Sequence, residues 1–248
     1  YFQVFEQTLD QSTVRMLRSV VDQTLGRRES LSEGQRDHKW WISLLDIRKI
    51  AGDDTVAKII APLVGSPAIQ SSMTAVGDDP VAVLHYCILR RFDPGRNPVP
   101  AQWHFDANIL GTRTQMINTW HPLVDVGETA PGLTLVRGAR RPARLWQRLV
   151  DSADAAGMFN AESRRATLFS DADVEAAIDA DPEAALVTPV VPAGGAISFD
   201  HLHLHGTQRL MPQMGMRESF EFRVMSEKTA LDSGLANQYG MIRLYTPA

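Results

Sequence analysis

From about Pro80 onward, the chain consists of short apolar runs that are separated by glycine, proline and aspartate residues. The runs read VAVLHYCILRRF, QWHFDANILG, TQMINTWHPLVDV, GLTLVRG, ALVTPVV, GGAISFDHLHLHG and ESFEFRVMS. Such runs are typical of β-strands, and the residues between them are typical of turns. Several short strands joined by turns favour an antiparallel sandwich or barrel, so we expect a mainly β fold with flanking helices.

The first third of the chain has a helical pattern instead. One helix is predicted in DQSTVRMLRSVVDQTLG, where Ser12 is a capping candidate and Gly26 a stop. A second helix is predicted in DDTVAKIIAPLVG, capped near Asp53 and ended by Gly65. We therefore expect a helical N-terminal third ahead of the strands.

The length and spacing of the chain suggest one domain. Sandwiches and barrels commonly reach 248 residues without dividing, so a single domain is expected over residues 4–248. Residues 1–3, YFQ, match the end of a protease site common in expression tags and are left out of the functional reasoning. An insertion rich in Ala, Asp and Arg interrupts the strand pattern from about 141 to 185, and we expect it to form a lid over the site.

The charge and hydropathy of the chain restrict its partners. A net charge of −4 and a pI near 6.0 give no reason to expect nucleic acid or an anionic membrane as partner. No window approaches the roughly 18 apolar residues of a membrane span, and the start is not a signal peptide. The single cysteine, Cys87, lies in an apolar run, which indicates a buried structural thiol in a reducing compartment. We expect a cytoplasmic protein that acts on a small molecule.

Two segments carry side chains that can bind a metal ion. In QWHFDAN, His104 and Asp106 are two positions apart on a predicted strand, so both side chains point to one face. Later, GGAISFDHLHLHGT places His201, His203 and His205 on alternate positions of a predicted strand, which offers a third ligand. Two imidazoles and one carboxylate on one face of an octahedral metal leave the other positions open, as in the facial triad of non-heme Fe(II) oxygenases.

The next strand, RESFEFRV, offers an anchor for a carboxylate. Arg217 and Ser219 are two positions apart, so they share a face of this strand. A guanidinium makes a forked contact with a carboxylate, and a hydroxyl beside it can share that contact. In such oxygenases, O₂ and a bidentate co-substrate must bind the same metal. Arg217 and Ser219 fit the distal carboxylate of one such co-substrate, 2-oxoglutarate.

Four motifs in order resemble the phytanoyl-CoA dioxygenase-like family of Fe(II)/2-oxoglutarate oxygenases: WHFDA, NTWHPLVDVGETAPGLTLVRGAR, GGAISFDHLHLHGT and RESFEFRV. The resemblance covers roughly residues 88–224 and implies a double-stranded β-helix, the jelly roll of cupin-like proteins. It implies Fe(II) as cofactor, with 2-oxoglutarate and O₂ as co-substrates and succinate and CO₂ as products. Hydroxylation of a small molecule usually follows, and we expect a biosynthetic intermediate as the substrate.

The resemblance also assigns the metal ligands. The family's second metal histidine ends the Gly-led strand and precedes a small residue, which selects His205 before Gly206. His203 is then expected in the core or beside the ligands, unless the alignment slips by one pair and makes it the ligand. Halogenases of this superfamily have Ala or Gly at the carboxylate position, so Asp106 favours hydroxylation, desaturation or ring formation over halogenation.

Several weaker candidates surround these motifs. Trp120 matches an aromatic family position close to the co-substrate, where it forms either a pocket wall or part of the core. Asn108 lies on the predicted face of the metal ligands and is a candidate for substrate contact. His121 beside Trp120, and Arg140 in RGAR, are further candidates for substrate contact.

Two pairs of adjacent residues leave their orientation open. Arg90 and Arg91 face opposite ways on their predicted strand, so one of the two can point into the interior. The tandem Trp40-Trp41 is expected to place at least one ring in the core, with a wall facing the substrate as the alternative.

Two other classes of protein compete with the oxygenase. A cupin-like metalloenzyme, an isomerase or hydrolase, would bind Zn²⁺, Mn²⁺ or Ni²⁺ with the same ligands and without 2-oxoglutarate. The pair Arg217 and Ser219 argues against this class, because a metal hydrolase needs no anchor for a 2-oxo acid. A non-catalytic jelly-roll binding protein is the other alternative, and the combination of triad and anchor argues against it.

Overall fold

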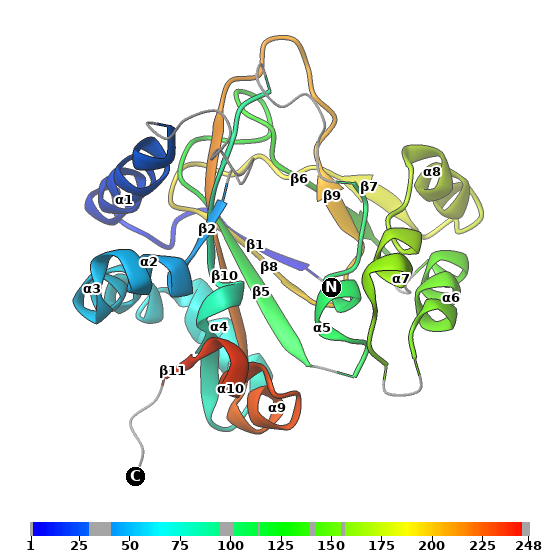
Figure 1. Ribbon diagram of the computed structural model, residues 1–248. Helices are drawn as coiled ribbons and strands as arrows, with labels where there is room; N and C mark the ends of the chain where they lie inside the picture. Colours follow the sequence, from blue (N-terminus) through cyan, green and yellow to red (C-terminus); the bar gives the residue numbers. More distant parts are fainter. Residues whose placement is uncertain are drawn as a thin grey trace.

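The computed structural model of the chain describes residues 2–29, 41–94, 102–113, 115–138, 142–154 and 157–244. Its strands form two sheets in which every pairing is antiparallel (Figure 1). The larger sheet has the order β1-β8-β5-β10-β3-β11, with β4 also beside β10 and β2 beside β4. Its strands are β1 (Phe2–Phe5), β2 (Trp41–Ser43), β3 (Pro80–Val83), β4 (Ile88–Phe92), β5 (Met116–Pro122), β8 (Ala196–Asp200), β10 (Arg217–Ser226) and β11 (Met241–Arg243).

The smaller sheet has the order β7-β6-β9 and lies opposite the larger one (Figure 1). Its strands are β6 (Leu133–Arg137), β7 (Ala185–Val187) and β9 (His205–Thr207). The chain passes from β5 to β6 and from β8 to β9, so it crosses twice from the larger sheet to the smaller one. Two antiparallel sheets joined by such crossings form a jelly roll, and the predicted antiparallel sandwich is confirmed.

The N-terminal third is mixed rather than helical throughout. The two predicted helices are present as α1 (Gln11–Glu29) and α3 (Asp53–Val64), and two helices that were not predicted, α2 (Leu44–Ala51) and α4 (Pro67–Val76), accompany them. Ser43 caps α2 and forms a capping box with Asp46, which fixes the start of that helix. However, β1 pairs with β8 and β2 pairs with β4, so this third also extends the larger sheet. Phe2 and Gln3, attributed above to a tag, are part of β1.

The apolar side chains of these helices are buried in the core of the molecule. No single described helix is long and apolar enough to cross a membrane, although α3 and α4 pass that test as a pair bent by 88°. Ile59, Leu63 and Ile69 from this pair are buried in the same cluster as Phe220 and Phe222 of β10. The two helices therefore cover one face of the larger sheet.

Strand β10 separates the core from the interior of the jelly roll. Its even positions carry Phe220, Phe222 and Val224, which pack in the core with the N-terminal helices. Because side chains alternate along a strand, the odd positions point to the opposite face. These positions carry Arg217, Ser219, Glu221 and Arg223.

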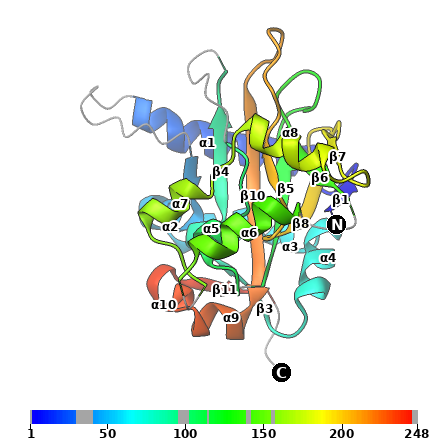
Figure 2. The ribbon, with the colours of Figure 1, turned by 90° about the vertical axis from the view of Figure 1, so that its right-hand side faces the viewer.

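The remaining helices lie around the sheets. They are α5 (Ala107–Leu110), α6 (Ala143–Ser152), α7 (Ala161–Ala166), α8 (Asp171–Asp179), α9 (Glu227–Asp232) and α10 (Leu235–Tyr239), with the 3₁₀ turn η2 (Leu84–Tyr86). Helices α6, α7 and α8 come from the predicted insertion and lie beyond the smaller sheet, in front of the strands in the turned view (Figure 2). Leu145, Leu149 and Val174 from this group are buried in a cluster with Trp103 and Phe105.

Candidate metal centre and its cavity

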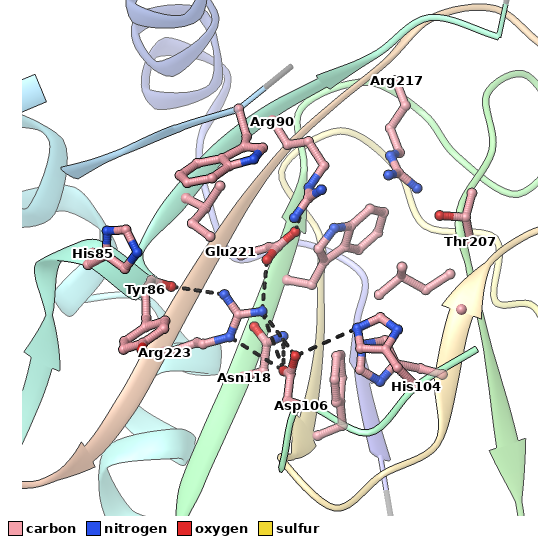
Figure 3. Close-up of a pocket in the computed structure, with 17 residues that line it drawn as sticks. His85, Tyr86, Arg90, His104, Asp106, Asn118, Thr207, Arg217, Glu221 and Arg223 are labelled. Atoms are coloured by element: carbon pink, nitrogen blue, oxygen red, sulfur yellow. Dashed lines mark hydrogen bonds and ion pairs between the residues drawn. The ribbon is translucent and has the colours of Figure 1, made fainter. Parts of the chain in front are cut away.

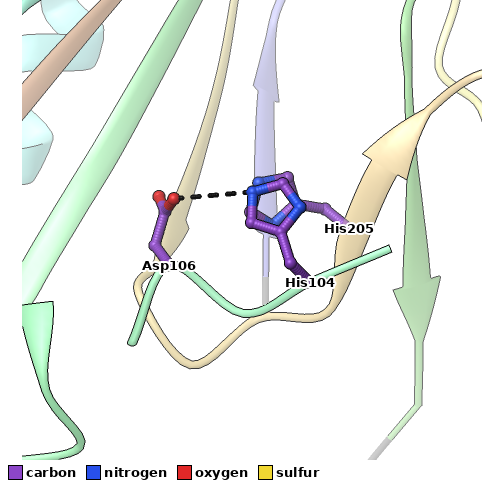
Figure 4. A group of neighbouring side chains, drawn as sticks. All are labelled: His104, Asp106 and His205. Carbon is purple, nitrogen blue, oxygen red and sulfur yellow. Dashed lines mark ion pairs between the residues drawn. The ribbon is translucent and has the colours of Figure 1, made fainter. Parts of the chain in front are cut away.

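Three side chains that the sequence singled out lie together in the interior. Ligand atoms of His104, Asp106 and His205 all lie within 4.8 Å of one another (Figure 4). The Nε2 atom of His104 is 3.8 Å from Oδ1 of Asp106, and the two imidazole centroids are 4.4 Å apart. Asp106 and His205 are buried, whereas His104 is partly exposed. Two imidazoles and a carboxylate at this spacing can hold one metal ion.

The backbone brings the two histidines together. The amide of His104 donates to the carbonyl of His205 (2.9 Å), and the amide of His205 donates to the carbonyl of His104 (3.1 Å). This exchange makes them an antiparallel pair, so their side chains lie side by side. The predicted strand through His104 and Asp106 is wrong, because pairing ends in this isolated bridge and Asp106 has a helical backbone at the start of α5.

The three histidines of HLHLH do not share one strand, contrary to the sequence prediction. β8 ends at Asp200, whose carboxylate accepts a hydrogen bond from the amide of Leu202 (2.7 Å), while its carbonyl accepts one from His203 (3.0 Å). This turn carries the chain from the larger sheet to the smaller one, and His205 begins β9. His203 packs its ring against Phe2 instead, with centroids 5.6 Å apart.

Both imidazoles are oriented by backbone carbonyl groups. The Nδ1 atom of His104 is 2.8 Å from the carbonyl oxygen of Gln102, and Nδ1 of His205 is 2.9 Å from that of His203. A proton on Nδ1 satisfies each contact and leaves the Nε2 lone pair free, as in metal-binding histidines. Burial and the neighbouring His104 lower the pKa of His205 to about 4, which keeps its ring neutral near pH 7.

Asp106 is held by two further residues, Asn118 and Arg223. Its Oδ2 accepts a hydrogen bond from Nδ2 of Asn118 (3.0 Å) and one from Nε of Arg223 (3.4 Å). The Nη2 atom of Arg223 is 3.2 Å from Oδ1, the oxygen that faces His104 (Figure 3). Burial alone would raise the pKa of Asp106, but Arg223 and the two imidazoles outweigh it and lower the pKa. The carboxylate is therefore charged, with one oxygen directed toward the imidazoles.

Replacing Arg223 by Gln is expected to weaken metal binding by roughly 10- to 100-fold, the usual effect of removing a residue that orients a metal ligand. The variant frees Asp106 from the contacts that aim its carboxylate and leaves it beside Glu221 with no cation between them. Titration with Co²⁺, followed by its visible absorption, measures the affinity. An affinity equal to that of the unmodified protein would show that Arg223 does not position the carboxylate.

The metal-binding residues open into a cavity of about 330 Å³ between the two sheets. Figure 3 shows His104 and Asp106 at one side of this cavity and Arg217 at another. The described lining consists of Trp41, His85, Tyr86, Ile88, Arg90, His104, Asp106, Asn118, Trp120, Leu133, Phe199, His205, Gly206, Thr207, Arg217, Glu221 and Arg223.

Arg217 is a buried cation without a counter-ion. Its side chain lies between the rings of Phe92 and Trp120, with centroids 5.2 and 5.8 Å from Cζ, and it forms no ion pair with any residue in the described ranges. Its Nη1 atom makes only long contacts of 3.5 and 3.4 Å with the carbonyls of Pro131 and Gly132, and Nε has no partner. Burial and the charge of Arg90 lower the pKa of Arg217 to about 10. Such a guanidinium is suited to an anionic ligand.

The other residues predicted around the co-substrate also lie near Arg217. Ser219 is fully buried on the same face of β10 but is not among the described residues that line the cavity, and its hydroxyl has no hydrogen-bond partner in the described parts of the chain. Trp120 lines the cavity and also packs in the core with Phe199, so it fills both roles that the sequence left open.

Two of the predicted substrate contacts lie elsewhere. Asn108 is buried on α5 and does not line the cavity, because Asp106 begins a helical turn there instead of continuing a strand. His121 points to the face of β5 opposite Trp120, where its Nδ1 atom is 3.2 Å from the carbonyl oxygen of Gly195. Arg140 lies outside the described residues.

The insertion also differs from its predicted role. None of its described residues lines the cavity. Instead, the indole nitrogen of Trp103 donates a hydrogen bond to Asp171 at the start of α8 (2.8 Å), and Phe169 forms a bridge with Trp103. The placement of these helices therefore does not support a lid, since they brace the backbone beside His104 from outside.

His121 gives the protein a dependence of stability on pH. Burial lowers the pKa of its ring to about 4, against about 6.5 in an unfolded chain. Between these values the unfolded chain binds a proton that the folded chain does not, so the free energy of unfolding falls as the pH falls from about 6.5 to 4. We expect His121→Gln to make this fall shallower by up to about 3 kcal/mol in urea unfolding. An unchanged fall would show that His121 is not the source.

The sequence left the inward-facing arginine undecided, and the structure identifies it. Arg90 lines the cavity and donates from Nε to Oε1 of Glu221 (2.9 Å). Arg91 points to the opposite side, where it pairs with Glu218 and Asp22. Trp41 takes the second role weighed for the tandem tryptophans and lines the cavity.

Glu221 and Arg223 were not predicted at the site, although the sequence contains a signal for them. In RESFEFRV, charged or hydroxyl side chains occupy every second position, which is unusual for a strand that lies in the middle of a sheet. An alternation of this kind predicts a polar interior face, and a polar interior points to a binding site.

Comparisons with known proteins support the fold. No family model and no curated protein sequence matches the chain. Among solved structures, the chain is similar to the non-heme alpha ketoglutarate dependent carbocyclase SnoK from nogalamycin biosynthesis, with a TM-score of 0.60 at 15% identity, over 91% of this chain and 80% of that one. It is similar to EvdO2 from Micromonospora carbonacea var. aurantiaca, with a TM-score of 0.58 at 18% identity, over 91% and 86% of the two chains.

A third similar structure is the epimerase SnoN in complex with Fe3+, alpha ketoglutarate and nogalamycin RO. Its TM-score is 0.52 at 16% identity, and the match covers 91% of this chain and 78% of that one. At such identities the likeness establishes a shared fold. The protein therefore has the jelly-roll fold of these enzymes.

Proposed function

We propose that the protein is a non-heme Fe(II)/2-oxoglutarate-dependent oxygenase of the phytanoyl-CoA dioxygenase-like family, formed by one domain. The observation that carries the proposal is that a His-Asp-His group and a buried, unpaired Arg217 open into the same cavity. A metal site alone would fit many enzymes. A diacid such as 2-oxoglutarate, which chelates the metal at one end, also requires a cation for the carboxylate at its other end, and Arg217 lies in the same cavity.

The residues present fit both groups. Nε2 of His104, Nε2 of His205 and Oδ1 of Asp106 would hold Fe(II), and a donor set of two imidazoles and one carboxylate suits this metal. When bound, the iron would supply the redox chemistry by which the substrate, O₂ and 2-oxoglutarate become the oxidised substrate, succinate and CO₂. Arg217 would bind the distal carboxylate of 2-oxoglutarate through its guanidinium, whose Nε has no partner among the described residues, with the hydroxyl of Ser219 on the same face of β10.

The surrounding residues prepare the cavity for this role. Trp120 and Phe92 flank the Arg217 guanidinium and exclude water from it, which strengthens its attraction for a carboxylate. Arg223 keeps Asp106 ionised and oriented. The carboxylate of Asp106 occupies the position at which a halide would otherwise bind, so we expect hydroxylation, desaturation or ring formation. We further expect a small biosynthetic substrate and a cytoplasmic location.

Decarboxylation of 2-oxoglutarate tests this proposal. The protein is supplied with Fe(II), ascorbate, O₂ and 2-oxoglutarate labelled in its C1 carboxyl group, and the release of labelled CO₂ is measured together with succinate. We expect both products in equal amounts from the unmodified protein and neither from the Asp106→Ala variant. Metal binding without either product, and without affinity for 2-oxoglutarate, would favour the cupin-like metalloenzyme instead.

A further inference from the structure

The cavity contains a second cation that the proposed co-substrate does not use. Arg90 extends from β4 into the cavity, and its side chain is 31% exposed. Its Nε atom donates to Glu221, but no described residue forms a hydrogen bond with its two terminal nitrogen atoms. Arg91, the next residue, is paired with two carboxylates on the outer side of the sheet. The terminal nitrogen atoms of Arg90 are thus available to a ligand.

A row of four charges connects Arg90 to the metal centre. Arg90 contacts Glu221 at 2.9 Å, Glu221 contacts Arg223 at 2.9 Å, and Arg223 contacts Asp106 at 3.2 Å (Figure 3). Two positive and two negative charges balance in the protein alone. If a metal ion binds Asp106, as the proposed function requires, the metal compensates the charge of that carboxylate. Glu221 then faces two guanidinium groups, and one positive charge remains uncompensated.

The walls near Arg90 are aromatic and apolar. Trp41 of β2 and Ile88 of β4 line this part of the cavity, together with His85 and Tyr86 of η2. The rings of Trp41 and His85 meet edge to face at 6.1 Å, and those of His85 and Tyr86 meet at 5.3 Å. A flat or apolar group can pack against these rings while an attached anion reaches Arg90.

We propose that Arg90 is the binding site for a carboxylate of the substrate, and that the substrate is an acid with a planar or apolar body. The inference rests on the proposed function, since the metal produces the excess positive charge. One uncompensated charge matches the single charge of a carboxylate, whereas a phosphate carries close to two at pH 7. The forked guanidinium edge also matches the two carboxylate oxygens.

The two arginines are suited to different ligands. Arg217 is buried, has no counter-ion among the described residues and lies between Phe92 and Trp120, which suits a co-substrate that is the same in every turnover. Arg90 is partly exposed and already held by Glu221, so it is oriented before the substrate arrives. Orientation by Glu221 lowers the entropy that Arg90 loses on binding.

Binding of three small probes tests the proposal. Phenylacetate, phenylacetamide and phenyl phosphate share an aromatic ring and differ in charge. Their dissociation constants are measured by calorimetry with the Mn²⁺-loaded protein, with and without saturating 2-oxoglutarate. We expect phenylacetate to bind at least about tenfold more tightly than the amide, and this ratio to fall to about one in Arg90→Gln. The matched control Arg91→Gln should keep the ratio of the unmodified protein.

Several results would overturn the assignment. These are equal binding of acid and amide, no binding of the acid, or a ratio that survives in Arg90→Gln. Tighter binding of phenyl phosphate would exclude the carboxylate. The Arg90→Gln variant should still bind 2-oxoglutarate, and loss of that binding would give Arg90 the role proposed for Arg217. If 2-oxoglutarate does not bind the unmodified protein, the proposed function fails, whereas the probe ratios measured with metal alone still test Arg90.

Discussion

Replacing Arg217 by Met is expected to weaken 2-oxoglutarate binding strongly and, at the same time, to stabilise the unliganded protein. Truncating one partner of a buried, charged contact costs about 2–5 kcal/mol, which corresponds to at least about a 30-fold loss of affinity. The buried charge of Arg217 is also the reason for the expected gain in stability. At pH 7 the folded chain must hold a buried guanidinium without a counter-ion, and the lowered pKa of Arg217 reflects that cost. Met fills much of the volume without a charge.

Arg223 provides a matched control on the same face of β10. It is buried like Arg217, but it pairs with Asp106 and Glu221. Removing one member of such a group costs about 3–5 kcal/mol, so Arg223→Met should lower the melting temperature. Arg217→Met should raise it by several degrees, for a gain of about 2 kcal/mol. Calorimetry of both variants without ligand measures the direction in which each melting temperature shifts. A lower melting temperature for Arg217→Met would contradict the description of Arg217 as an uncompensated charge.

Replacing Asp106 by Ala is expected to weaken metal binding by more than about 100-fold, because the variant lacks the only carboxylate of the triad. Asp106→Asn keeps the size and one oxygen atom, and it should lose most of the affinity through loss of charge. Equilibrium dialysis against Co²⁺ measures both variants.

His203→Gln serves as the control for this experiment. His203 lies in the turn before β9, with its ring against Phe2, whereas His205 lies beside His104. His203→Gln should therefore bind metal as the unmodified protein does, and His205→Gln should not. Loss of metal in His203→Gln with full binding in His205→Gln would reverse the assignment of the ligand.

The architecture and the residue types of the site could be predicted from the sequence. Alternation and turn residues indicate antiparallel strands directly, and the spacing of His104 and Asp106 limits how far apart their side chains can lie. The backbone path between the sheets was harder to predict. HLHLH continues the period of a strand, but the Asp200 carboxylate binds the amide of Leu202 and turns the chain there. Local periodicity does not report such a competing hydrogen bond.

The contacts that Glu221 and Arg223 make with distant segments could not be predicted. Arg90 and Glu221 are neighbours only because β4 pairs with β10 in the register that sets Ile88 opposite Glu221. Arg223 reaches Asp106 because the segment after His104 turns into α5 instead of continuing as a strand. Asn108 was placed at the site by assuming a continuous strand, and that assumption failed where α5 begins. The contacts of these charged residues around the metal ligands are therefore seen only in the folded structure.

Anaerobic titration of the metal-free protein with Fe(II) and then 2-oxoglutarate is the most direct test of the central claim, that one cavity holds both. The account predicts a visible charge-transfer band that grows to one equivalent of each component. The band should be absent when succinate replaces 2-oxoglutarate, and weaker in Arg217→Met. Stoichiometric binding of Fe(II) without any such band at saturating 2-oxoglutarate would contradict the account.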